Sequence, residues 1–330
     1  MTSHPRFPRR RLLRLAAPLL AALPACWLVG PSHAARERAR SENVVLVLID
    51  GLRWQEVFTG ADETLMTKEA GGVAQPAELR KRYWRETAES RRRTLMPFLW
   101  DVVATQGQLY GNRAKGSAAR VTNPHHFSYP GYSEMIVGFA DPRIDSNAKK
   151  PNPNATVFEW LHRKPSFQGK VAAIGAWDVV PSIVNRERCG FPVFAGLEPI
   201  THGKISAEQS LLNRLKANGT QPWDWGPYDS VVSESALEFI KANRPRAMWL
   251  TFGETDEWAH ERRYDRYLDA AQFTDAYLRD LWQTLQSMSQ YRGRTTLLVC
   301  IDHGRGRTVA DWTSHSNKVP GADEIWMAAL

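Results

Sequence analysis

Five runs of hydrophobic residues recur along the chain, and each has the composition of a buried β-strand. The runs are short, nearly continuous and rich in Val, Leu and Ile, which is typical of strands covered on both faces. They are Asn43–Ile49 (NVVLVLI), 170–174 (KVAAI), Ala247–Phe252 (AMWLTF), 295–301 (TTLLVCI) and 324–330 (EIWMAAL). The last run reaches Leu330, so either the final sheet edge is short or further residues follow.

Helical patterns lie between these runs. Residues 97–105 form one such pattern, which ends before Gly107. A longer helix is indicated by apolar residues that follow one another at steps of three, four or seven: Leu268, Ala271, Leu278, Leu281, Leu285 and Met288. The alternation of strands and helices predicts an α/β fold with a mostly parallel central sheet and helices on both faces. Two polar stretches, roughly 60–93 and 140–235, are interpreted as loop insertions over the active-site edge.

The first 34 residues have the layout of a secretory signal peptide. A basic start with four Arg precedes an apolar run from Leu12 to Val29, which Arg14 and two prolines interrupt, and residues 32–34 (SHA) offer small side chains at a cleavage site. The uninterrupted apolar part is shorter than the ~20 residues that a membrane span needs. We therefore predict export to the periplasm or the exterior, and a single domain at 35–330 without a transmembrane span.

Two patterns bear on the route of export. Residues 9–14 (RRRLLR) resemble a twin-arginine signal, so the twin-arginine and general secretory routes both stay open. Residues 23–26 (LPAC) resemble a lipoprotein box, which would place a lipid anchor on Cys26. With only three Cys in 330 residues, a disulfide-rich scaffold is excluded.

The net charge of +8 would favour nucleic-acid binding if it were spread over the whole chain. Without the first 34 residues, however, 38 basic residues face 35 acidic ones, a net charge of +3. One basic cluster remains at 80–93, and Glu86 and Glu89 dilute it. We interpret that cluster as a solvated helix face and expect no specific nucleic-acid binding.

Acidic residues follow three of the predicted strands. Asp50 directly follows the first run, Asp256 comes four residues after the third, and Asp302 and His303 directly follow the fourth. In open parallel sheets, ligands bind at the carboxyl ends of the strands. The three strand ends are therefore expected to bring carboxylates and one imidazole to the same edge.

The spacing of these residues suits metal binding. Asp256 and His260 are four residues apart, so on one helical turn both side chains can hold the same ion. Asp302 and His303 could share an ion only in a tight turn, which the glycines after them allow. His315 lies in a polar loop before the last strand. Any one of them alone would be an ordinary surface or satisfied residue; together, oxygen and imidazole ligands suit Zn²⁺, Mn²⁺ or a similar ion.

The segment 122–134 (TNPHHFSYPGYSE) offers a nucleophile. Pro130 can open a helix that continues to Gly138, which would place Ser128 just before the helix N-terminus. Backbone N–H groups and the helix dipole favour an anion there, either a serine alkoxide or a phosphoryl group. Ser128 could equally be a simple N-cap residue. The residues alone leave both interpretations open.

Taken together, these motifs resemble the alkaline phosphatase superfamily, and within it the type I phosphodiesterase/nucleotide pyrophosphatase branch. The resemblance extends from about residue 43 to 330, although the segments between the motifs carry little of it. In order, the motifs are 47–53 (VLIDGLR), 128–133 (SYPGYS), Asp256 with His260, 302–304 (DHG) and His315. The resemblance implies an alkaline phosphatase-like fold and hydrolysis of a small-molecule phosphodiester or phosphomonoester.

The resemblance also implies two divalent metal ions, Zn²⁺ in most members, with Mn²⁺ as the alternative. The ligands of the metal that holds the nucleophile match Asp50, Ser128, Asp302 and His303. The ligands of the second metal match Asp256, His260 and His315. In such sites the metals lie about 3.5–4 Å apart and clamp an in-line displacement. Ser128 would form a phosphoserine intermediate that water hydrolyses, with net retention at phosphorus.

Three departures from the family pattern limit the assignment. The branch often uses Thr as the nucleophile, where this chain has Ser128. Formylglycine sulfatases share the fold but need an Arg where Tyr132 stands, which argues against that chemistry and leaves promiscuous sulfate-ester cleavage open. A family Asn that binds a phosphate oxygen is matched here by Asn147. No Arg can be assigned as a clamp for monoesters, so the choice between diester and monoester stays open.

Two other functions remain alternatives at this stage. The same site could serve an arylsulfatase or a phosphonate hydrolase. The chain could also be a catalytically inactive metal-binding protein of the cell envelope, although intact residues at all seven ligand positions speak against this. The natural substrate and the oligomeric state are not determined by the sequence.

Overall fold

The computed structural model describes residues 41–330. The signal peptide predicted for residues 1–34, the twin-arginine pattern and Cys26 lie outside these residues. Residues Ala39–Leu330 form one compact unit of the chain. Within the described part, no helix combines the length and the apolar character needed to cross a bilayer.

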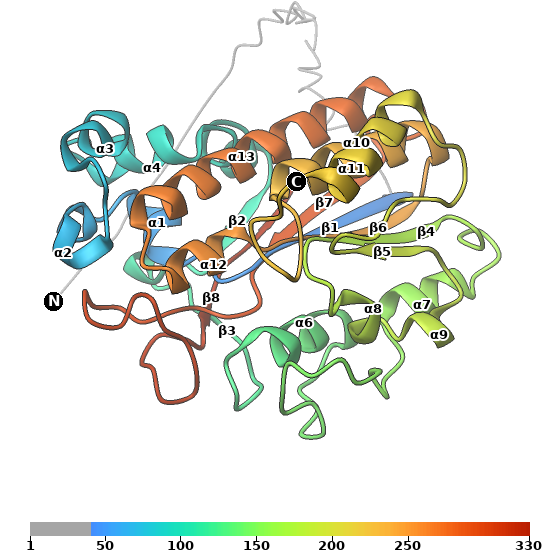
Figure 1. Ribbon diagram of the computed structural model, residues 1–330, viewed down its shortest axis with the longest axis horizontal. Coiled ribbons are helices and arrows are strands. Elements are labelled where there is room, and N and C mark those ends of the chain that lie inside the picture. The colour runs from blue at the N-terminus through green and yellow to red at the C-terminus, as the bar shows by residue number, and fades with distance from the viewer. Residues whose placement is uncertain (1–40) are drawn as a thin grey trace, which may run out of the picture. The chain divides into compact units, whose positions relative to one another are not determined.

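Residues 41–330 contain a seven-stranded sheet in the order β2-β9-β7-β1-β6-β4-β5 (Figure 1). At its centre, β1 (Asn43–Ile49) lies parallel to both β6 (Ala247–Phe252) and β7 (Thr295–Cys300). Beyond β6, the strands β4 (Val171–Gly175) and β5 (Val193–Ala195) continue the parallel arrangement. The predicted mostly parallel sheet is confirmed, and four of its strands, β1, β4, β6 and β7, match predicted hydrophobic runs to within one residue.

The last hydrophobic run forms two strands instead of the single strand that the sequence predicts. β9 (Met327–Ala329) pairs antiparallel with β7 and with β2 (Gln108–Tyr110), at one edge of the main sheet. β8 (Glu324–Ile325) pairs with β3 (Ala119–Arg120) in a separate two-stranded sheet. Trp326 separates the two strands, because its ring is fully buried and its indole N–H donates to a backbone carbonyl group at 3.0 Å.

Helices cover both faces of the main sheet, as predicted (Figure 1). On one face lie α10 (Ala207–Asn218), α11 (Asp229–Asn243) and α13 (Tyr264–Ser287). On the other lie α6 (Ser128–Val137) and α7 (Val157–His162). The long amphipathic helix predicted from the leucine spacing is α13, and Met288 caps its C-terminus.

Alternate side chains of β1 enter two separate hydrophobic cores. Val45, Val47 and Ile49 belong to the core under α11 and α13. Leu46 and Leu48 belong to the core under α6 and α7. Because both faces are buried, the strand reads as a continuous apolar run without polar alternation.

The remaining helices are short and lie mainly in the connections. The 97–105 pattern forms a π-helical turn (Leu99–Val103) followed by α5 (Ala104–Gln106), and it ends at Gly107 as predicted. The other helices are α1 (Trp54–Thr59), α2 (Lys68–Gly71), α3 (Pro76–Tyr83), α4 (Ala88–Leu95), α8 (Val180–Ile183), α9 (Arg186–Cys189) and α12 (Glu254–His260), with single 3-10 turns at Glu63–Leu65 and Arg113–Lys115.

The two stretches that we interpreted as insertions differ in structure. Residues 60–93 consist of short helices, whose basic side chains meet acids: Arg80 pairs with Glu63 at 2.5 Å, and Arg82 pairs with Asp269. Residues 140–235 include β4 and β5, so this stretch also contributes two strands to the central sheet. The helices of the first stretch are too short and too polar for a clear apolar period, so the sequence pattern did not reveal them.

Candidate active site

Polar side chains from separate segments meet at the carboxyl edge of the parallel strands. Asp50 follows β1, and Asp302 and His303 follow β7. Asp256 lies in the first turn of α12, which begins directly after β6. Ser128 is the first residue of α6. The sequence pattern placed it just before the helix, but Phe127 takes the extended N-cap conformation, so the helix already includes Ser128.

Two glycines allow these segments to approach one another closely. Gly51 has φ of 60°, and a Cβ atom there would lie 2.5 Å from Asp256 Oδ1. At Gly131 in α6, a Cβ atom would lie 2.3 Å from the carbonyl oxygen of Asp302. Any larger residue at either position would push Asp256 away from the β1 turn, or α6 away from Asp302.

Asp50, Asp302 and His303 form a first cluster, in which one ligand atom from each lies within 4.8 Å of the others. His303 Nε2 is 3.2 Å from Asp50 Oδ1 and 3.2 Å from Asp302 Oδ2. Its Nδ1 donates to the Gly304 carbonyl at 2.9 Å, which leaves the lone pair on Nε2. Within residues 41–330, Asp50 Oδ1 and Asp302 Oδ2 are buried oxygens without a hydrogen-bond donor.

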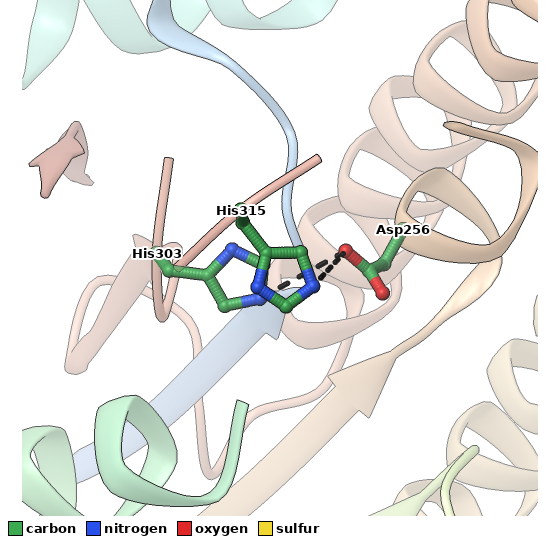
Figure 2. A group of neighbouring side chains, drawn as sticks. All are labelled: Asp256, His303 and His315. Atoms are coloured by element: carbon green, nitrogen blue, oxygen red, sulfur yellow. Dashed lines mark ion pairs between the residues drawn. The ribbon is translucent and has the colours of Figure 1, made fainter. Parts of the chain in front are cut away.

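Asp256, His303 and His315 form a second such cluster (Figure 2). The rings of His303 and His315 stack with centroids 3.9 Å apart, and each Nε2 lies 3.8 Å from Asp256 Oδ1. His260 Nε2 adds a third imidazole nitrogen, 3.0 Å from Asp256 Oδ2 and 3.0 Å from His315 Nε2. His315 Nδ1 donates to the His126 carbonyl at 3.2 Å, so its Nε2 also keeps a lone pair.

Ser128 and Asn147 line a cavity of about 210 Å³ beside these clusters. The buried Ser128 Oγ lies 3.5 Å from His303 Nε2. Asn147 Oδ1 accepts the backbone N–H of Tyr129 at 2.9 Å, which holds the amide next to the first turn of α6. The structure therefore brings every residue that the sequence singled out, Asn147 included, to one place.

The carboxylates of the first cluster repel one another and are poorly solvated. Burial, and then the charge of Asp256, raise the pKa of Asp50 to about 8, although the Tyr132 hydroxyl donates to its Oδ2 at 3.0 Å. Burial and the charge of Asp50 also raise the pKa of Asp302 well above its ordinary value. Cations bound between these oxygens would remove the conflict.

The surroundings shift the pKa values of the three histidines in different directions. Burial lowers the pKa of His303 to about 4, and burial with the neighbouring His303 lowers the pKa of His315 to about 2. Both imidazoles are therefore neutral at pH 7, which is the form that binds a metal. Burial also lowers the pKa of His260, but the charge of Asp256 outweighs it and the net shift is upward.

The donor set fits divalent transition metals. Carboxylate oxygens and neutral imidazole nitrogens, with no thiolate, are the ligands of catalytic Zn²⁺ and of Mn²⁺. The two buried oxygens without a donor point at His303, where a cation would complete their coordination. Asp50, Asp302 and His303 could hold one ion, and Asp256, His260 and His315 could hold the other.

Sequence reasoning missed Arg305, which is 1% exposed and lies against the second cluster. Its guanidinium contacts the Asp256 carboxylate, and its Nε donates to the Trp312 carbonyl at 3.1 Å. Burial raises the pKa of Asp256, yet Arg305 and the histidines hold it well below its ordinary value. The position of Arg305 two residues after His303 was the only available signal.

Three more residues that line the cavity had no sequence signal: Trp177, Trp225 and Glu257. Trp177 follows β4, and Trp225 lies between α10 and α11. Glu257 follows Asp256 in α12, and burial together with the charge of Asp256 raises its pKa to about 7. All three reach the site through tertiary packing, so their spacing in the sequence carries no information about it.

No protein-family model matches the sequence, and no curated protein matches it by sequence. Solved structures do match by fold. The lipoteichoic acid synthase LtaP from Listeria monocytogenes superposes with a TM-score of 0.51 at 12% identity, over 88% of this chain and 65% of that one. The 2-O GAG sulfatase BT1596 gives 0.51 at 11% identity, over 88% and 64%.

A protein of the alkaline phosphatase superfamily from Vibrio parahaemolyticus gives a TM-score of 0.49 at 14% identity, over 89% of this chain and 60% of that one. This chain thus spans less than two thirds of the length of these proteins. The predicted alkaline phosphatase-like fold is confirmed. The finer placement in the type I phosphodiesterase/nucleotide pyrophosphatase branch stays a prediction.

Proposed function

We propose that this chain, which has the fold of the alkaline phosphatase superfamily, is a metal-dependent hydrolase of phosphodiesters or phosphomonoesters with Ser128 as its nucleophile. The observation that carries the proposal is the cluster itself. Six side chains of metal-binding types from four segments meet beside one cavity, which four of them line, and Ser128 Oγ lies 3.5 Å from His303 Nε2. A purely structural role would not require two buried carboxylate oxygens without hydrogen-bond donors, Asp50 Oδ1 and Asp302 Oδ2, at one place.

The residues divide into two ligand sets. Asp50, Ser128, Asp302 and His303 would hold one metal, and Asp256, His260 and His315 would hold the other. When bound, two Zn²⁺ ions would supply positive charge that favours the serine alkoxide and the charge developing on the phosphoryl oxygens.

The position of Ser128 suits attack on phosphorus. Its Oγ forms a bond to phosphorus while the bond from phosphorus to the leaving oxygen breaks, and the departing alcohol takes up a proton. Water then cleaves the phosphoserine, which restores the Ser128 hydroxyl and releases the phosphate product. The backbone N–H of Ser128, at the first position of α6, can donate to a phosphoryl oxygen during both steps, whereas the Tyr129 N–H already binds Asn147 Oδ1 and Pro130 has no N–H.

We further propose that the protein acts outside the cytoplasm. The support is the sequence of residues 1–34, with its basic start, its apolar run and its small residues before position 35.

The proposed activity can be tested with aryl esters. Purified protein loaded with Zn²⁺ should hydrolyse bis-p-nitrophenyl phosphate or p-nitrophenyl phosphate, lose activity with a chelator, and recover it with Zn²⁺ or Mn²⁺. Cleavage of p-nitrophenyl sulfate alone would instead establish a sulfatase. Failure on all three esters by protein that contains metal would contradict the proposal.

A further inference from the structure

Tryptophan residues line part of the cavity that holds Ser128, and two further tryptophans pack next to them. Trp177 and Trp225 line this cavity. Trp223 stacks behind Trp225, with ring centroids 5.1 Å apart and planes 9° apart. Trp258 meets Trp223 edge to face, also at 5.1 Å. We call these four residues the tryptophan wall.

The rings of the tryptophan wall are held in place by their neighbours. Trp225 lies against the backbone of Gly253, where an added Cβ atom would be 2.9 Å from the ring. Trp177 packs edge to face on Tyr132, with centroids 5.7 Å apart. The indole N–H of Trp223 donates to Glu261 at 3.0 Å. A ligand that meets these rings therefore finds a surface that is already ordered, which lowers the entropic cost of binding.

The charge beside the wall is negative. The Glu257 carboxyl lines the cavity, and Glu261 lies next to Trp223. Among the described residues that line the cavity, none is Lys or Arg. Lys149 follows Asn147 by two residues, but its ammonium lies 2.6 Å from Asp178 Oδ2, so an acid already compensates its charge.

We propose that the ester cleaved at Ser128 carries a small quaternary ammonium group, of the choline type, which binds against the tryptophan wall. This inference rests on the proposed hydrolase activity. Cations bind the faces of aromatic rings, Trp best of all, and the attraction is strongest where water is excluded. Glu257 lines the same cavity, which no Lys or Arg lines, so no basic side chain of the lining would repel the ammonium group.

The size and charge of the cavity disfavour larger or more anionic substrates. Its volume of about 210 Å³ is below the roughly 300–1,000 Å³ of pockets for drug-sized ligands. A phosphoryl group and a short ammonium alcohol are compact enough for such a space. Further phosphates or sulfates on the substrate would face Glu257 with no basic residue to pair them.

Two matched substrates test the inference. The choline ester p-nitrophenylphosphorylcholine and the corresponding neohexyl ester have nearly the same shape, and only the first carries a charge. Zinc-loaded protein should cleave the choline ester with a kcat/KM about tenfold higher or more. Equal values for the two esters would overturn the inference and leave the hydrolase activity standing. Preference for the p-nitrophenyl ester of thymidine 5′-phosphate would point instead to nucleotides.

Variants of the wall provide a second test. Trp225→Ala should bring the ratio between the choline and neohexyl esters close to one, and Trp225→Tyr should keep part of it. Trp160→Ala is the matched control, because Trp160 is 56% exposed and does not line the cavity. An unchanged ratio in Trp225→Ala would contradict the inference.

A binding measurement separates this inference from the proposed reaction. Phosphorylcholine should bind the zinc-loaded protein more tightly than neohexyl phosphate in titration calorimetry, whether or not either ester is cleaved. Equal affinities would overturn the ammonium site. Tight binding of phosphorylcholine without hydrolysis of any ester would support the site and contradict the proposed function.

Discussion

Asp256 sits between a buried arginine and three imidazoles, and this environment controls its charge. Arg305 contacts its carboxylate, His260 Nε2 lies 3.0 Å away, and the pKa of Asp256 is held well below its ordinary value. Asp50, which has no such cation, has its pKa raised to about 8 by burial and by the charge of Asp256. Two carboxylates of one site thus favour different protonation states when no metal is bound.

Replacing the nucleophile tests the role of Ser128 directly. Ser128→Ala should lower kcat/KM on an aryl phosphate by at least about 10³-fold, because no group remains to form the covalent intermediate. Folding should be unaffected, since the change removes one oxygen. The exposed Ser166→Ala is the control and should retain full activity. Retained activity in Ser128→Ala would show that another group attacks phosphorus.

Asp302→Asn separates metal binding from folding. The substitution keeps the shape of the side chain and removes one buried negative charge, so bound metal should fall from two ions to about one per chain. Activity should fall by about 10²-fold or more, whereas urea unfolding of metal-free protein should show no loss of stability. Elemental analysis measures the first effect. Unchanged metal content would mean that Asp302 is not a ligand.

At the scale of elements, one carboxylate joins the long helix to the chain before β2. Asp275 in α13 accepts the backbone N–H groups of Phe98 at 2.7 Å and of Leu99 at 2.8 Å. These donors begin the π-helical turn at Leu99–Val103 and have no helical carbonyl to bind. Asp275 therefore serves as a cap that comes from another helix.

Removing this cap should destabilise the fold. Asp275→Ala leaves two buried N–H groups unpaired and should lower the free energy of unfolding by about 2–3 kcal/mol. Urea denaturation monitored by circular dichroism measures this. Asp280→Ala, at an exposed position of the same helix, should change stability by no more than about 0.5 kcal/mol. Equal effects of the two substitutions would rule out the capping role.

At the scale of the whole molecule, the register of the parallel strands places the site. Asp50 follows β1, and its neighbours β6 and β7 lead to Asp256 and Asp302. Because the three strands run in the same direction, their carboxyl ends lie side by side. The sheet therefore gathers acids that are distant in sequence, and bound metal would offset the repulsion between their charges.

Metal removal should change how stability depends on pH. In metal-free protein the raised pKa values of Asp50 and Asp302 stabilise the fold while both are protonated, and this stability is lost as pH rises through the folded pKa of about 8 for Asp50. His303 and His315 are neutral in the folded chain and lose their last protons in the unfolded chain just above pH 6.5, which raises stability by less than about 1 kcal/mol in total and offsets part of this loss. Between pH 6.5 and 8, stability should fall by about 2 kcal/mol per carboxyl group at most.

Saturating Zn²⁺ should abolish this part of the pH dependence and raise the unfolding temperature. At a free concentration of one hundred times Kd, one bound ion adds about 2.7 kcal/mol. Differential scanning fluorimetry at pH 6.5 and 8, with and without chelator, measures both effects. Identical pH profiles in the two conditions would contradict a metal site at Asp50 and Asp302.

Much of the fold was predictable because its information is local. A strand buried on both faces, such as β1, must be apolar throughout, and a long helix such as α13 repeats its apolar residues every three or four positions. The interruption between β8 and β9 at Trp326 was not predictable, because it depends on where the large indole ring can be buried in the folded protein. The same holds for β5, which is too short to carry a pattern.

The sequence by itself indicated which residues of this protein could carry chemistry, because acids and Asp–His pairs after apolar runs, together with a serine before a helix-opening proline, form a pattern that none of these residues forms alone. Only the tertiary structure decided what surrounds them. The contact of Arg305 with Asp256, the tryptophan wall and the two unsatisfied oxygens each depend on chain segments that are distant in sequence. Distance between atoms and loss of water set the charge and selectivity of a site, and neither is encoded in the spacing of residues along the chain.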